Sequence, residues 1–233
     1  MIDREKIIRY YRATGDHEQA ARILDVAESA LHNRRFCVTE FLDPHAFSIA
    51  ETVAAYEDGL LLQSQGGFDA AERVRAVFAC RDFRGTVPSL VEAVGVEWNT
   101  QFYPLTHRDV LGGLLALGIK RSVVGDILMV PGGCQIVVDP SILPFLQQEL
   151  QRLGAAMVRT KPILLSELQP RPETVKEIRS TVASLRLDSV AAAGFGGTRT
   201  QKTEEIQADR VKVNWEDAKN PSQSVKAGDV ISF

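Results

Sequence analysis

The sequence is poor in cysteine, and its three cysteines, Cys37, Cys80 and Cys134, stand far apart. It contains no CxxC pair and no cluster of cysteine with histidine, so the usual zinc sites are excluded and we expect no metal and no other cofactor. A sparse, odd number of cysteines fits a reducing compartment, and we expect a cytoplasmic protein.

Long apolar runs and an excess of positive charge are also missing. No run approaches the roughly 20 residues of a membrane-spanning helix, and the opening residues do not resemble a signal peptide. With 27 Lys and Arg against 30 Asp and Glu, the net charge is −3, which excludes a general polyanion binder. Any nucleic-acid contact must therefore depend on a local basic patch, and the acidic region 41–99 is a poor place for one.

Residues 1–58 carry the apolar spacing of helices and predict an N-terminal helical region. The repeating positions are Ile7, Ile8 and Tyr11, then Ala20, Ile23, Leu24 and Ala27. Asp16 is a plausible cap for the second of these helices. Within Phe41-Leu42-Asp43-Pro44 one element ends and a helix begins, because Asp43 can cap it and Pro44 suits the first helical position.

Residues 59–160 alternate strands with helices and predict a layered α/β domain. We expect strands at 60–62, 74–80, 94–98 and 156–158, a short helix at 69–72, longer helices from Thr106 to Gly118 and over 140–153, and a hairpin in which Pro131-Gly132-Gly133 joins 127–130 to 135–138. Residues 161–180, with three prolines among charged residues, predict a linker.

Residues 181–233 predict a smaller domain in which two short helices precede two short strands. Basic side chains gather where these elements begin, at Arg186, Arg199, Lys202, Arg210 and Lys212. If they converge, their donors suit phosphate oxygens. The alternative is a solvated face in which Asp188 holds Arg186, and Glu204 or Glu205 holds Arg199.

The sequence around His107 has two interpretations. Thr106 and Asp109 have the spacing of a capping box, which makes this stretch a helix start. The functional alternative is phosphate contact by Thr106, His107 and Arg108 at that helix start. No nucleophile stands nearby, so we do not expect acid–base catalysis there.

Two groups of motifs resemble known families. Arg186-Leu187-Asp188, Thr198-Arg199, Arg210–Asn214 and Gly228–Ile231 resemble the S4 domain, an RNA-binding fold. Together with Phe41–Pro44, Leu105–Gly112, Leu117–Arg121, Gly125–Leu128 and Gly132–Gln135, they resemble the YlmH family. That resemblance implies an α+β protein with N-terminal helices, a middle domain similar to the RRM plait, and a C-terminal S4 domain. The middle domain has no aromatic RNP-type motif for stacking on bases.

Three functions compete on these grounds. The family resemblance implies a non-catalytic protein that binds structured RNA, either ribosomal RNA or tRNA, with the large ribosomal subunit as a partner. An RNA-modifying enzyme is disfavoured, because the 45 residues after Asp188 cannot hold a pseudouridine synthase domain. The third is a protein-interaction or assembly factor linked to photosystem II or cell division, which the labels of some branches imply, with a cyanobacterial or plastid location.

Overall fold

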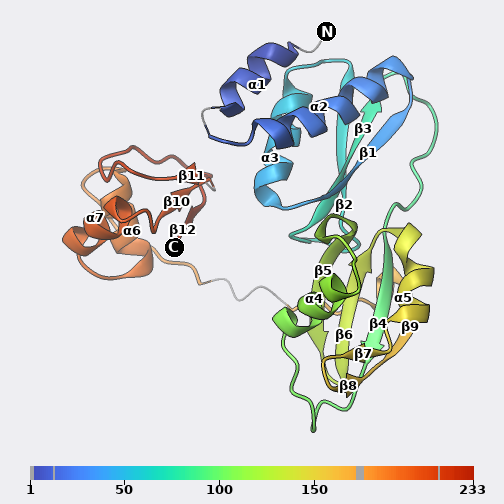
Figure 1. Ribbon diagram of the computed structural model, residues 1–233. Helices are drawn as coiled ribbons and strands as arrows, with labels where there is room; N and C mark the ends of the chain where they lie inside the picture. The colour runs from blue at the N-terminus through green and yellow to red at the C-terminus, as the bar shows by residue number, and fades with distance from the viewer. Residues whose placement is uncertain (1–2, 13, 172–175, 215) are drawn as a thin grey trace. The chain divides into compact units, whose positions relative to one another are not determined.

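The computed structural model describes residues 3–12, 14–171, 176–214 and 216–233, and the chain separates into two compact units, Met1–Arg171 and Pro172–Phe233 (Figure 1). Both units combine helices with antiparallel sheets, so the expected α+β class is confirmed. Each unit has its own apolar cores, and each is described separately below.

The N-terminal part of the first unit packs three helices against a three-stranded sheet. The helices are α1 (Arg4–Arg12), α2 (His17–His32) and α3 (Pro44–Ala55), and the strands β1 (Phe36–Leu42), β2 (Leu60–Gln65) and β3 (Val74–Cys80) lie in the order β1-β3-β2. Asp43 caps α3 as expected, since its carboxylate accepts a hydrogen bond from the Ala46 N–H at 2.8 Å. Asp16 precedes α2 but makes no side-chain cap.

The expected boundary between residues 58 and 59 is wrong, because it cuts through this sheet. The helical interpretation missed β1, whose seven residues are mostly β-branched or aromatic. Strands β2 and β3 pair with β1 and with each other, so they belong to the N-terminal part rather than to the middle domain. The short helix expected at 69–72 is a turn instead, with Ala70 at a positive φ of 61°.

The middle part is a βαββαβ plait. It runs through β4 (Glu92–Glu97), α4 (His107–Ala116), η1 (Arg121–Val123), β5 (Val124–Val130), β6 (Gly133–Val138), η2 (Pro140–Ile142), α5 (Leu143–Glu149) and β9 (Arg159–Ile163). The sheet order β5-β6-β4-β9, antiparallel throughout, is that of an RRM-like fold, so the expected plait is present. The expected hairpin joins β5 to β6, and Gly132 supplies the positive φ of 84° at its turn.

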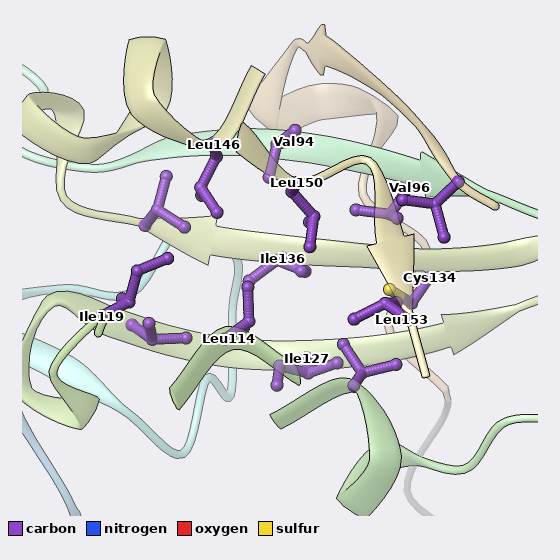
Figure 2. Close-up of a cluster of buried hydrophobic side chains, with 14 of the residues drawn as sticks. Val94, Val96, Leu114, Ile119, Ile127, Cys134, Ile136, Leu146, Leu150 and Leu153 are labelled. Carbon is purple, nitrogen blue, oxygen red and sulfur yellow. The ribbon is translucent and has the colours of Figure 1, made fainter. Parts of the chain in front are cut away.

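One face of the plait sheet and the two helices enclose the main core of this part (Figure 2). Val94, Val96 and Ile136 from the strands meet Leu114 of α4 and Leu146 of α5, all of them fully buried. A small hairpin of β7 (Arg152–Leu153) and β8 (Ala156–Met157) adds Leu153, which lies so close to Gly113 that a Cβ there would clash with it. The helices therefore have fixed positions over one sheet face.

Two boundaries near the end of the plait differ from the expectation. Helix α5 ends at Glu149 rather than Leu153, because residues 152–157 turn back as the β7–β8 hairpin. The fourth strand of the plait is β9, and together with η3 (Leu165–Glu167) it occupies the start of the expected linker. Residues 172–175 of that linker lie outside the described residues.

Arg73, just before β3, and Arg75, on β3, tie the N-terminal part to the plait. Arg73 donates side-chain hydrogen bonds to the carbonyls of Val124, Phe41 and Arg121 at 3.1, 3.0 and 3.3 Å. Arg75 forms an ion pair with Asp139 at 2.6 Å and donates to the Leu90 carbonyl at 3.0 Å. These bonds join the two parts, so the first unit is expected to unfold as one body.

In its described residues, the second unit is a small domain of two helices and three very short strands. Helices α6 (Leu187–Phe195) and α7 (Arg199–Gln207) pack on β10 (Lys212–Val213), β11 (Glu216–Asp217) and β12 (Ile231–Ser232), whose order is β11-β10-β12. Leu187, Ile206 and Val211 are fully buried and form the centre of its core. Asp209 and Asn214 adopt left-handed conformations, with φ of 54° and 51°, at the turns before and after β10.

Candidate nucleic-acid interface

The starts of α6 and α7 are held in different ways. The first N–H groups of α6 bond to a loop rather than to a side chain: Leu187 donates to the Gln223 carbonyl at 2.8 Å and Asp188 to the Pro221 carbonyl at 3.0 Å. Helix α7 begins with a capping box between Thr198 and Gln201, as the sequence predicts. Both helix starts therefore have fixed backbones.

A buried carboxylate joins these two helix starts. Asp188 is only 2% exposed and accepts two hydrogen bonds from Arg186, from Nε at 3.2 Å and from Nη2 at 2.8 Å. It also pairs with Nε of Arg199 at 3.1 Å. The hydrogen bonds from Arg186 hold the pKa of Asp188 well below its usual value, with further contributions from Arg199 and Ser189.

The two arginines line an open cleft of about 460 Å³, together with Asp188, Thr200, Thr203, Pro221 and Ser222. Their side chains are 37% and 56% exposed, so both guanidinium groups reach solvent. Asp188 uses Nε and one Nη of Arg186 but only Nε of Arg199, which leaves other N–H donors available to a ligand. Such a pair of oriented forks matches phosphate oxygens.

The hydroxyl groups of the cleft were missed by sequence reasoning, and Asp188 was considered only as a partner of Arg186. The hydroxyl of Thr203 donates to the Arg199 carbonyl at 3.0 Å, and that of Ser222 donates to Asn220 at 2.6 Å. The hydroxyl of Thr200 has no protein partner within the described part of the chain. The position of Thr200, one residue after Arg199 in the first turn of α7, was a readable signal for a second donor.

The remaining basic residues proposed for this surface do not line the cleft. Lys202 is 8% exposed; its ammonium group bonds Glu205 at 2.7 Å and lies 4.2 Å from the centre of the Phe233 ring. It is thus an internal cation, contrary to the expectation. Lys212 is exposed and pairs loosely with Asp217 at 3.5 Å, and Arg210, two residues before it, is also exposed.

Thr106, His107 and Arg108 belong to the first unit, and all three are exposed. The structure confirms that Thr106 and Asp109 form a capping box, with the Thr106 N–H donating to the Asp109 carboxylate at 2.8 Å. The hydrogen bond from the Thr106 hydroxyl, followed by this backbone bond, lowers the pKa of Asp109. The capping interpretation is thus correct, and it leaves His107 and Arg108 exposed on the first turn of α4.

The acid stability of the second unit is expected to depend on Asp188. Its pKa is lowered in the folded state, so its ionised form contributes stability that is present above about pH 4 and lost as the pH falls further. Thermal melts over a pH series should show Asp188→Asn losing less stability than the wild type below about pH 4. Asp209→Asn, at an exposed site, is the matched control. If the melting temperatures of Asp188→Asn and the wild type fell in parallel with pH, the stabilising role of the ionised Asp188 would be contradicted.

Two kinds of feature are absent from the described residues. Across residues 3–12, 14–171, 176–214 and 216–233, no helix has both the length and the apolar character to cross a membrane. In the same ranges, no three His, Cys, Asp or Glu side chains come together in a way that could hold a metal ion.

The chain combines a plait with a small two-helix domain that carries an arginine cleft, and both are types of domain that bind RNA. Comparison with known proteins agrees. Family models match residues 15–83 ("YlmH, N-terminal"), 90–167 ("Putative RNA-binding domain in YlmH") and 185–231 ("S4 domain"). A relative from Bacillus subtilis (strain 168), "Ribosome-associated protein quality control protein P2", is 34% identical over 201 residues, covering 85% of this chain and 77% of the relative. The chain belongs to the YlmH family.

A solved structure shares the fold. "Cell division protein ylmH from Streptococcus pneumoniae" aligns with a TM-score of 0.57 at 24% identity, covering 66% of this chain and 93% of that chain. The matched ranges of the family models also support the corrected architecture, because the N-terminal model extends past β3 to residue 83 and the next begins at residue 90.

Proposed function

We propose that this protein is a non-catalytic, ribosome-associated protein that binds structured RNA, either ribosomal RNA or tRNA, through the arginine cleft of its S4 domain. The observation that carries the proposal is the pair of exposed guanidinium groups, Arg186 and Arg199, which line an open cleft and are oriented by one buried carboxylate. The association with the ribosome is supported by the printed name of the relative from Bacillus subtilis.

The proposed mechanism is recognition of backbone shape rather than of sequence. Double-stranded RNA offers proteins mainly phosphates and 2′-hydroxyl groups, because side chains cannot read its deep, narrow major groove. Arg186 and Arg199 would bind phosphate oxygens with the N–H groups that Asp188 leaves available, and Thr200 would donate its hydroxyl proton to a neighbouring oxygen. Arg210 and Lys212 would extend the contact along the backbone.

Affinity for a structured RNA is expected to fall steeply with salt. Each neutralised phosphate contributes a slope of about −0.9 to a log–log plot for a duplex and about −0.7 for a single strand, since bound counterions are released. Because Lys202 is internal, four contacts remain and predict a slope of roughly −3. Fluorescence anisotropy with a labelled tRNA over a salt series measures it, and a flat plot would contradict phosphate binding and favour a protein-interaction role.

A further inference from the structure

The sheet face on which an RRM plait usually stacks nucleobases is closed in this protein. Phe41 from β1 packs against Ala93 and Val137 on that face, together with Leu168 from the segment after β9. The Gln135 side chain is 8% exposed and bonds the backbone of residues 167 and 169 at 2.9 and 2.7 Å. A nucleobase that contacts the plait must therefore do so elsewhere.

The loop from β4 to α4 carries an aromatic side chain that has no place in any core. Phe102 is 75% exposed, more than any other large hydrophobic side chain among the described residues. In Figure 1 this loop extends away from the plait, beyond the end of the sheet. Single exposed hydrophobic side chains are common on protein surfaces, so Phe102 is a candidate contact only together with the turn that holds it and the basic residues that follow it.

Hydrogen bonds within the loop hold Phe102 in its exposed position. The Asn99 carboxamide oxygen accepts from the N–H groups of Gln101 and Phe102 at 3.2 and 3.4 Å, and the Asn99 carbonyl accepts from the Tyr103 N–H at 3.0 Å. The indole of Trp98, itself 8% exposed in the core, donates to the Tyr103 carbonyl at 2.9 Å. The ring thus stands on a braced turn, which reduces the entropy lost on binding.

The basic residues that follow this ring in the sequence favour an anionic polymer. His107 and Arg108 are exposed on the first turn of α4, a few residues after Phe102. The two acidic residues nearest to the ring in the sequence already have partners. Asp109 accepts hydrogen bonds from Thr106, and Glu97 pairs with Lys161 at 2.6 Å. An exposed ring and cationic donors a few residues apart offer the two kinds of contact with which proteins stack a base and hold its phosphate.

We propose that Phe102 stacks on an unpaired nucleobase of the bound RNA while Arg108 contacts the adjacent phosphate, so that the plait recognises a loop or single-stranded segment through its β4–α4 loop rather than through its sheet. This inference rests on the proposed function in that RNA is the ligand. It adds a second site that distinguishes unpaired from paired RNA, whereas the S4 cleft would bind the backbone of either.

The test compares two synthetic RNAs with the same stem, one closed by an unpaired loop carrying 2-aminopurine and one a blunt duplex, at a single salt concentration. Phe102→Ala should weaken binding of the stem–loop about tenfold and leave the duplex unchanged, since stacking requires an unpaired base. It should also abolish the change in 2-aminopurine fluorescence. Phe102→Trp should restore both the affinity for the stem–loop and the fluorescence change. Phe145→Ala, which removes a 43% exposed ring on α5, is the matched control.

The outcomes separate this proposal from the S4 cleft. Unchanged affinity of Phe102→Ala for the stem–loop, or equal losses for both RNAs, overturns the stacking site. Arg199→Ala should weaken binding of both RNAs. If it leaves both affinities unchanged, the S4 cleft is excluded as an RNA site. The stacking site is then still tested by whether Phe102→Ala weakens binding of the stem–loop more than binding of the duplex.

Discussion

Arg73→Ala is expected to lower the free energy of unfolding of the first unit by roughly 2–4 kcal/mol, because three backbone carbonyls lose their donor at once. Those carbonyls belong to Phe41, Arg121 and Val124, which lie on both sides of the contact between the N-terminal part and the plait. Phe41 and Val124 are buried, and water cannot easily replace the guanidinium group there. Arg73→Lys should lose most of the same stability, because an ammonium group cannot match the fork.

Urea unfolding of the full chain measures this effect, and trypsin cleavage at the exposed Arg84, in the segment between the two parts, reports whether they separate. The matched control is Arg81→Ala, an exposed arginine just after β3, which should change the stability by under about 0.5 kcal/mol. If Arg73→Ala were as stable as this control, the hydrogen bonds of Arg73 would contribute little to holding the N-terminal part and the plait together.

Local signals in the sequence predicted local structure well. The caps of Asp43, Thr106 and Thr198 involve groups only three residues apart, so each could be recognised without knowledge of the fold. The Pro131-Gly132 turn and the core spacing of the plait were predictable for the same reason. These elements depend on residues that are close to one another in the sequence.

The domain boundary failed because it depends on pairing between distant strands. Strand β1 is joined to β3, so about forty residues separate partners such as Phe36 and Ala79. Neither strand can satisfy its backbone groups alone, and no pattern within β1 indicates which strand completes the sheet. Strand β9 was missed for a related reason, since Pro162 in its middle is typical of a linker or an edge strand, and β9 lies at the edge of its sheet.

The candidate cleft was predictable only in part. Arg186 and Arg199 were identified from their positions at helix starts, and the structure brings them together. Their common partner Asp188 was weighed for Arg186 alone, while Arg199 was assigned to Glu204 or Glu205. Lys202 shows the limit of such reasoning, because a sequence cannot indicate that a lysine at helical spacing turns inward towards Glu205 and the Phe233 ring.

Arg199→Ala is expected to weaken binding of structured RNA by about tenfold, because a charge-assisted contact to phosphate is worth on the order of 1–3 kcal/mol. The fold should remain intact, since Arg186 still supplies two hydrogen bonds to the buried Asp188. Arg186→Ala is expected to behave differently. It removes both of those bonds, so it should lower the melting temperature of the S4 domain as well as the affinity for RNA.

The central claim, that the S4 cleft binds RNA, is tested most directly by the dissociation constant of Arg199→Ala for a labelled tRNA, measured together with its melting temperature at one salt concentration. Lys226→Ala, which removes the same charge from an exposed site outside the cleft, is the control. The account predicts a dissociation constant about tenfold higher than that of the control, with melting temperatures within about 2 °C of the wild type. Equal dissociation constants in two folded variants would contradict it.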